Sequence, residues 1–165
     1  MRKYSDEPEE RAAEEQCERD IQSYGLHILK VTGDDEWPEF AYTVGLFHSF
    51  NHPEVIILGL PGETAQAILN SLADVIRSGK RFAAGDQSDD LVENYPCKFL
   101  AIPPAQVTAH FGWAFWYYGE DRFPALQLVY PDRQHRWPWD EGVATGFLEQ
   151  QPILSKVAVP GWATR

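Results

Sequence analysis

The clearest pattern in the chain is a wide apolar stripe at helical spacing between residues 63 and 78. Its members are Ala65, Ile68, Leu69, Leu72, Val75 and Ile76. Gly79 follows at the position where glycine commonly ends a helix. A second periodic segment runs from Pro8 to Gly25, behind Asp6 and Glu9 at the spacing of a capping box. The spacing predicts a helix over each segment.

A third helix is predicted from Pro103-Pro104 to about Tyr118, because proline suits a first helical turn. Shorter apolar runs predict strands at 26–31, 40–46, 55–60, 97–102 and 125–130. The run 55–60 is almost wholly apolar, which is typical of a central strand. Only eight residues separate it from the run 40–46, too few for a helical crossover, so this pair is predicted to be antiparallel.

Together these elements predict a single α+β domain over residues 1–165. It would hold a mainly antiparallel sheet of about five strands packed with three helices. Residues 47–54 and 80–94 are expected to be loops, and residues 1–5 and 143–165 peripheral tails.

Charge changes the picture of what the domain could bind. The net charge is −11, and residues 1–40 hold 12 acidic and five basic side chains. Such a field repels phosphate backbones, so nucleic-acid binding through a basic face is not expected. A basic protein partner fits, as does an acidic face that only serves solubility.

Other features of the sequence bear on the cellular compartment in which the protein is expected. No run approaches 18 apolar residues, so no membrane span is expected, and the acidic N-terminus does not resemble a secretory signal. Cytoplasmic residence is therefore expected. Cys17 and Cys97 form no metal-binding spacing and are read as small apolar core residues.

The segment between the runs 40–46 and 55–60 carries the densest polar chemistry. His48 and His52 could hold a metal ion with Glu54, a weak candidate because half of a ligand set is missing. Tyr42, Thr43, His48, His52 and Glu54 could instead line a polar pocket for acid–base chemistry. In the simplest interpretation His52-Pro53-Glu54 only shapes a turn. No nucleophile-elbow, Walker or dinucleotide-binding motif is present.

Aromatic residues gather in two places. Trp113 and Trp116 lie in the predicted third helix and are expected to pack in the core. Trp137-Pro138-Trp139 lies in a segment without periodicity, where large aromatic rings are harder to bury. Trp137 and Trp139 are therefore the best candidates for an exposed recognition surface.

Several strings together resemble one bacterial family, the domain of unknown function 4262. They are FAYTVGLFHSFNHPEVIILGLP, then Gly85-Asp86, Tyr95-Pro96, and ALQLVYPD before WPW, which cover about residues 20 to 142. By this resemblance the family signature is carried by Tyr42, Thr43, Gly45, Leu46, His52, Pro53, Glu54, Gln127, Pro131, Asp132, Pro138 and Trp139. Asn51 stands where typical members have glycine, and asparagine also tolerates a positive φ. The resemblance implies no activity.

The order of elements around Thr43-Val44-Gly45 is also similar to the first part of flavin-reductase-type split barrels, which would imply a flavin. Three functions stay open. The first is an acidic binding or regulatory protein of immunity type. The second is a small-molecule or flavin-binding enzyme with its pocket around Tyr42–Glu54, and the third is a metal-dependent hydrolase. We expect Tyr42, His52, Glu54 and Asp132 to converge on one site, and Gln127 is a further candidate for binding a ligand or partner.

Overall fold

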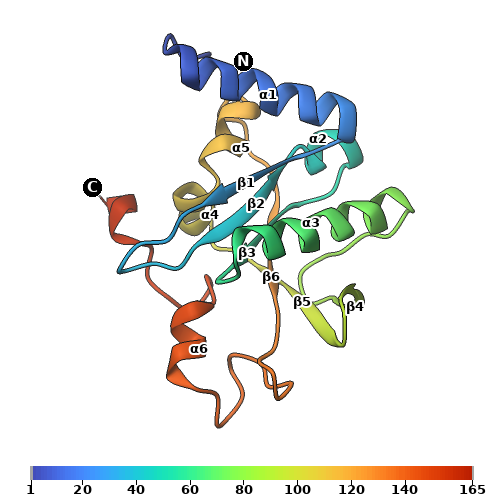
Figure 1. The fold of residues 1–165 in the computed structure, drawn as a ribbon, viewed down its shortest axis with the longest axis vertical. Coiled ribbons are helices and arrows are strands. Elements are labelled where there is room, and N and C mark those ends of the chain that lie inside the picture. Colours follow the sequence, from blue (N-terminus) through green and yellow to red (C-terminus); the bar gives the residue numbers. More distant parts are fainter. Residues whose placement is uncertain (1, 165) are drawn as a thin grey trace.

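A six-stranded mixed sheet forms the centre of the protein in the computed structural model, which describes residues 2–164 (Figure 1). The strands are β1 (His27–Val31), β2 (Phe40–Val44), β3 (Glu54–Leu58), β4 (Gln87–Val92), β5 (Tyr95–Ala101) and β6 (Ala125–Val129). Their order is β1-β2-β3-β6-β5-β4. Only β3 and β6 run parallel; the other neighbours are antiparallel.

Helices cover both faces of the sheet. They are α1 (Pro8–Tyr24), α2 (Leu46–Phe50), α3 (Gly62–Arg77), α4 (Pro104–His110), α5 (Gly112–Tyr117) and α6 (Thr145–Gln150), followed by the short 3-10 helix η1 (Gly161–Thr164). In the described part of the chain, no helix is both long and apolar enough to cross a membrane.

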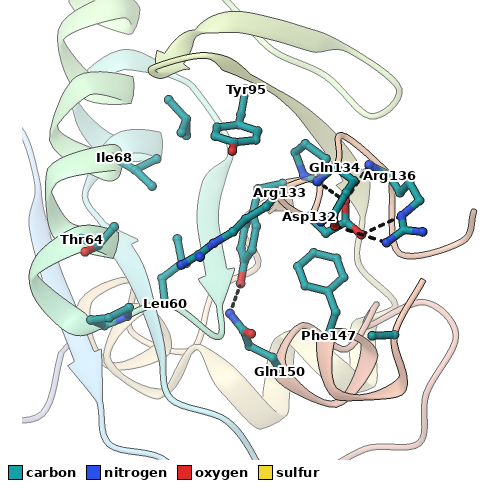
Figure 2. A pocket seen from close by; sticks show the side chains of 15 residues that line it. Leu60, Thr64, Ile68, Tyr95, Asp132, Arg133, Gln134, Arg136, Phe147 and Gln150 are labelled. Atoms are coloured by element: carbon teal, nitrogen blue, oxygen red, sulfur yellow. Dashed lines mark hydrogen bonds and ion pairs between the residues drawn. The ribbon is translucent and has the colours of Figure 1, made fainter. Parts of the chain in front are cut away.

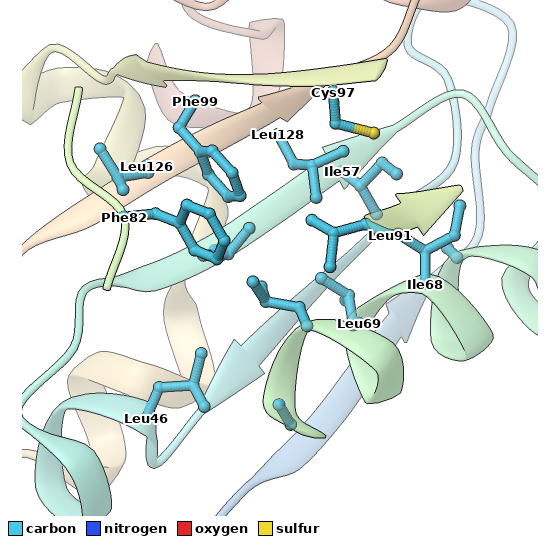
Figure 3. Close-up of a cluster of buried hydrophobic side chains, with 14 of the residues drawn as sticks. Leu46, Ile57, Ile68, Leu69, Phe82, Leu91, Cys97, Phe99, Leu126 and Leu128 are labelled. Atoms are coloured by element: carbon cyan, nitrogen blue, oxygen red, sulfur yellow. The ribbon is translucent and has the colours of Figure 1, made fainter. Parts of the chain in front are cut away.

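The first core layer lies between the sheet and α3, and it confirms the predicted apolar stripe. Ile68, Leu69 and Leu72 of α3 are buried against Ile57 of β3. Figure 3 shows further side chains that complete this layer, among them Phe82 from the connection after α3 and Phe99 from β5. The rings of Phe82 and Phe99 stack with centroids 4.4 Å apart.

The second core layer lies on the opposite face, under α1, α4, α5 and the C-terminal segment (Figure 1). Alternate residues of each strand point to opposite faces, so Tyr42 and Ile56 enter this layer while their neighbours enter the first. Cys17 is buried here and Cys97 in the first layer, and both thiols are free, as expected of apolar core residues.

Several predictions of elements were wrong in detail. The sheet has six strands rather than about five, because the polar strand β4, expected to be a loop, pairs with β5 at the edge. The expected loop 47–54 contains α2, and the predicted third helix is broken into α4 and α5 at Phe111. The central position of β3 and its antiparallel pairing with β2 are confirmed.

The start of α1 also differs from its prediction. Asp6 and Glu9 do not form a capping box, since the N-cap residue is Glu7 and makes no side-chain capping bond. The Ser5 hydroxyl instead accepts a hydrogen bond from the amide of this N-cap residue and donates one to the Glu10 carboxylate. The predicted end is confirmed, with Gly25 at φ 90°.

The C-terminal segment 143–165 was expected to be peripheral, yet residues 151–154 are buried. Two glutamine side chains bind this segment to β6. The Gln127 side chain donates to the Pro152 carbonyl and accepts from the Leu154 amide. Gln151 in turn bonds to both backbone groups of Tyr130.

Candidate functional site

The polar residues between β2 and β3 form a closed network of hydrogen bonds around the carboxylate of Glu54, which we call the Glu54 network. Glu54 is 0% exposed. Its two oxygens accept hydrogen bonds from the hydroxyl of Thr43 at 2.7 Å and from the amides of Gly45, Leu46 and Phe47 at 3.0, 3.1 and 3.2 Å. The hydroxyl of Tyr118 donates a fifth bond. Because these amides belong to the first turn of α2, Glu54 caps that helix.

The backbone conformation around the Glu54 network explains why glycine stands at position 45. Gly45 has φ 112°, and a Cβ atom there would lie 2.9 Å from the Gly25 carbonyl oxygen. Asn51 ends α2 with φ 54°, as its tolerance of a positive φ allows. Burial raises the pKa of Glu54, while the bonds from Tyr118, Thr43 and the α2 amides act in the opposite direction.

The His52 side chain is also fully engaged in internal hydrogen bonds. It is 0% exposed, its Nδ1 lies 2.9 Å from the Pro53 carbonyl oxygen, and its Nε2 accepts the Phe82 amide at 3.1 Å. These two contacts define one neutral tautomer with the proton on Nδ1. Burial lowers the pKa of His52 below its usual range. Neither nitrogen is left for a metal or a substrate proton.

The side chains of two other residues of the expected pocket, Tyr42 and His48, do not take part in the Glu54 network. The Tyr42 hydroxyl lies in the second core layer and accepts the Trp113 amide at 3.0 Å. His48 lies on α2 with its side chain exposed. Across residues 2–164 no three His, Cys, Asp or Glu side chains gather in a group that could hold a metal ion. The pocket expected around Tyr42–Glu54 is therefore replaced by internal hydrogen bonds.

Asp132 does not join His52 and Glu54. Glu54 opens β3 and pairs in parallel register with Ala125 at the start of β6, whereas Asp132 follows the end of β6. The expected convergence was wrong because the parallel pairing of β3 with β6 puts these residues at opposite ends of the sheet. Gln127, in the middle of β6, binds the C-terminal segment.

A cavity of about 570 Å³ opens instead where β3 and β6 end; we call it the β3–β6 cavity (Figure 2). Leu60 and Pro61 follow β3, while Tyr130 to Arg136 follow β6. The start of α3, Tyr95 of β5 and Phe147 of α6 form the remaining walls. The full lining is Leu60, Pro61, Thr64, Ile68, Val92, Tyr95, Tyr130, Pro131, Asp132, Arg133, Gln134, Arg136, Ala144, Phe147 and Gln150.

Of the charged side chains that line the cavity, Asp132 and Arg136 form an ion pair, whereas Arg133 forms none with the described residues. Asp132 accepts the amides of Gln134 and Arg136 and pairs with the Arg136 guanidinium at 3.0 Å. Slight desolvation works against ionisation, but the bonds from Arg136 and Gln134 hold the pKa of Asp132 below its usual range. Arg133 forms no hydrogen bond or ion pair with any residue that the structure describes, and its side chain reaches across the cavity toward Leu60 and Thr64 (Figure 2).

Trp137 and Trp139 lie side by side with parallel rings, 5.6 Å between centroids and 3° between planes. Trp139 is 38% exposed, as predicted, whereas Trp137 is half-buried, and their part in recognition stays a prediction. The Lys98 ammonium lies 4.7 Å from the Trp137 ring and 5.3 Å from the Trp139 ring, and Lys156 lies 5.6 Å from Trp139. Two lysines therefore contact the indole pair, while the exposed Asp140 and Glu141 follow it directly.

Sequence reasoning missed Arg133, Tyr95 and Phe147 as cavity residues. A signal existed for Arg133, since Pro131-Asp132-Arg133 directly follows a buried strand, and ligands of open α/β sheets bind beyond the carboxyl ends of parallel strands. That rule could not be applied because β3 and β6 were not recognised as a parallel pair. Phe147 lies in a segment whose sequence shows no periodicity.

The six strands form one open sheet with β1 and β4 at its edges, so the similarity to split barrels does not extend beyond the order of the elements. No curated protein and no solved structure matches the chain. Residues 20–144 match the model of a protein family. This range includes the Glu54 network, every strand and most of the lining of the β3–β6 cavity. The chain therefore belongs to the family described as a domain of unknown function, DUF4262.

Proposed function

We propose that the protein is a small-molecule-binding module whose ligand, an organic anion with an apolar or aromatic body, occupies the β3–β6 cavity. The observation that carries this proposal is Arg133. Its exposed side chain forms no ion pair with the described residues and extends into a cavity with mainly apolar walls. A carboxylate or phosphate would supply the missing partner, since guanidinium binds both through paired hydrogen bonds.

The shape of the cavity supports the same ligand class. Its volume of about 570 Å³ lies within the usual range of small-molecule sites, roughly 300–1,000 Å³. Tyr95, Tyr130 and Phe147 offer aromatic surface for an apolar body, and Leu60 and Ile68 add aliphatic surface. Thr64 and Gln150 are the polar groups on either side that could orient such a ligand (Figure 2).

The start of α3 adds a favourable field. Pro61 and Thr64 bring the first turn of this 16-residue helix to the cavity, and its N-terminus has no side-chain capping bond. Unpaired amides at a helix N-terminus favour negative charge. This contribution is secondary to Arg133.

Binding is favoured over catalysis because Asp132, the one acidic group of the cavity lining, is fully engaged. Both of its oxygens accept hydrogen bonds from residues 134–136. A general base needs a free oxygen within reach of a substrate proton. The remaining lining residues contain no histidine, cysteine or lysine.

The test is a screen of aromatic carboxylates and phosphate esters, each paired with its neutral amide or alcohol, read by amide chemical shifts in two-dimensional NMR. We expect saturable shifts in residues 60–64 and 130–136 for anions only. Arg133→Gln should weaken binding about tenfold or more, the equivalent of about 1.4 kcal/mol. Thr64→Trp should block the cavity while leaving its charge unchanged.

Arg122→Gln is the matched control, because Arg122 is an exposed arginine just before β6, at the opposite end from the cavity. If this variant loses as much affinity as Arg133→Gln, the effect is one of net charge and the proposed site is wrong. Neutral analogues that bind as well as the anions would also overturn the proposal.

A second proposal is that the protein resides in the cytoplasm and binds a basic protein partner. The observation that favours it is the exposed acidic surface of α1, which includes Glu9, Glu10 and Glu15. An electrostatically guided complex should form quickly and weaken with salt. If a partner captured by pull-down binds Glu9→Gln/Glu15→Gln as it binds the parent at every salt concentration, this proposal fails.

A further inference from the structure

A second cavity differs from the β3–β6 cavity in composition and charge, and the proposed function does not use it. Its volume is about 270 Å³, and it shares no lining residue with the β3–β6 cavity. The connection between β1 and β2, the end of α4 and the 3-10 helix η1 surround it; we call it the η1 cavity. It is lined by Val31, Thr32, Asp34, Trp37, Pro38, Phe40, Ala109, His110 and Trp162.

Four aromatic rings meet at this cavity. Phe40 and Trp162 are nearly parallel, 14° apart, with centroids separated by 6.4 Å. Trp37 stands at 90° to Trp162 with centroids 5.9 Å apart. The His110 ring lies edge-on to both Phe40 and Trp162, at 5.0 and 5.8 Å.

Hydrogen bonds to the backbone and to Asp34 hold the segments that carry these rings. The Trp162 indole donates to the Ala109 carbonyl at 3.1 Å, and His110 Nδ1 lies 2.9 Å from the Gln106 carbonyl oxygen. The Trp37 amide donates to Asp34 at 2.8 Å. These bonds restrict the walls before binding, which lowers the entropic cost, and leave only a small adjustment of the rings for binding.

The charge around the η1 cavity is negative. Asp34 belongs to its lining, and the exposed side chains of Asp35 and Glu36 follow directly. Oδ1 of Asp34 accepts the Glu36 and Trp37 amides, while Oδ2 makes no hydrogen bond to the residues that the structure describes. No lysine or arginine lines the cavity. Aromatic faces beside a carboxylate favour a cation, most of all one that is weakly hydrated.

Two residues of the lining each carry a buried polar atom without a partner. Trp37 Nε1 and His110 Nε2 form no hydrogen bond with the residues that the structure describes, and His110 as a whole is only 3% exposed. With Nδ1 donating to the Gln106 carbonyl, Nε2 of the neutral ring is an acceptor, whereas Trp37 Nε1 is a donor. Buried polar atoms are nearly always paired, so a hydroxyl group, which both donates and accepts, is a ligand group that would suit this donor and this acceptor.

We propose that the η1 cavity binds a small quaternary ammonium compound that carries a hydroxyl group on a short arm, with choline as the simplest example. The methylated ammonium lies against the indoles of Trp37 and Trp162 beside Asp34. The hydroxyl accepts from Trp37 and donates to His110, and the rings adjust slightly to open those two atoms to it. This site is independent of the anion site at Arg133.

The experiment is a titration of the full chain with choline, followed by the indole N–H signals of its six tryptophans. Trp37→Phe and Trp162→Phe assign the two relevant signals. The probe controls are tetramethylammonium, which lacks the hydroxyl, and 3,3-dimethyl-1-butanol, the neutral carbon analogue of choline. We expect choline to shift the Trp37 and Trp162 signals saturably, tetramethylammonium to bind several-fold more weakly, and the neutral alcohol to bind at least about tenfold more weakly.

Three variants separate the contributions. Trp162→Ala should lose about tenfold or more in affinity, and Asp34→Asn about threefold with a smaller effect of salt. Trp139→Ala, which removes an exposed indole elsewhere, should bind choline like the parent. An unchanged amide spectrum away from residues 31–40 and 105–110 shows that each variant is folded.

Phosphatidylcholine vesicles form a further arm, because a lipid headgroup has the same chemistry as free choline. Sedimentation with vesicles but no response to free choline would overturn the proposal of a free ligand. Equal binding of the neutral alcohol would show that charge plays no part, and it would overturn the cation site. So would the absence of any shift up to tens of millimolar choline.

Discussion

The hydroxyl of Tyr118, just past α5, donates a hydrogen bond to the carboxylate of Glu54 at the start of β3. The same hydroxyl accepts the amide of His48 at 3.2 Å. One side chain therefore joins the end of α5, the first turn of α2 and the central part of the sheet. Burial and the neighbouring Glu54 carboxylate both raise the pKa of Tyr118, so the hydroxyl stays protonated and remains a donor.

Tyr118→Phe should lower the free energy of unfolding by about 1–3 kcal/mol, because a buried carboxylate loses a donor that nothing replaces. Urea unfolding measures the change. Tyr24→Phe, on a tyrosine that is 65% exposed, is the matched control and should stay within about 0.5 kcal/mol of the parent. In a Glu54→Gln background the Tyr118→Phe change should cost less; an equal cost in both backgrounds would mean that the two groups do not interact.

Leu72→Ala tests the first core layer. Leu72 is fully buried on α3 among the residues that face the sheet. Its truncation should cost about 2–5 kcal/mol, through lost apolar contact and the cavity left behind. Val75→Ala, on the same helix but only partly buried, should cost less. A loss below half a kcal/mol for Leu72→Ala would contradict the assignment of this face.

The two buried histidines predict a pH dependence of stability. Burial lowers the pKa of His52 and of His110, so the folded protein favours the neutral rings. Their stabilising contribution is fully present above the unfolded pKa of about 6.5 and is lost as the pH falls toward the folded values. Each ring can contribute at most about 1.4 kcal/mol per pH unit in that window.

Unfolding free energies measured from pH 8 to 5.5 should therefore decline below about pH 6.5. His52→Gln should flatten the decline, even if it lowers stability throughout. The exposed His135 supplies the control, and His135→Gln should leave the slope unchanged. A flat profile in the parent protein would show that the histidines are not held in the neutral form.

The sequence predicted elements well wherever apolar residues were periodic. The stripe on α3 and the apolar run of β3 specify their partners through burial, which is why their bounds were found within a few residues. β4 could not be predicted in this way. Its sequence, Gln87 to Val92, is mostly polar, and it is a strand only because β5 offers an open edge with which to pair.

The chemistry of the candidate site was harder to predict, for a physical reason. Sequence shows which polar residues are present but not whether their donors and acceptors are satisfied. His52 and Glu54 looked reactive, yet the fold surrounds them with backbone amides and hydroxyls. Arg133, by contrast, follows a buried strand in the sequence, but this signal could be interpreted only once the parallel pairing of β3 and β6 placed the residue over a cavity.

The last prediction concerns the C-terminal segment, which the polar side chain of Gln127 holds against β6. Gln127 is 1% exposed and spans two backbone groups of residues 152 and 154, at 2.9 Å each. Gln127→Leu keeps the size of the side chain but leaves the Pro152 carbonyl and the Leu154 amide without that partner. Stability should fall by about 1–3 kcal/mol.

The local effect should exceed the global one, because Gln127 bonds directly to residues 152 and 154 of this segment. Limited proteolysis should therefore cut the Gln127→Leu protein between residues 143 and 160 while the sheet is still folded. The exposed Gln22 on α1 provides the control, and Gln22→Leu should be cut no faster than the parent. If Gln127→Leu loses stability without faster cleavage in this segment, Gln127 supports the sheet as a whole and not the attachment of the C-terminal segment.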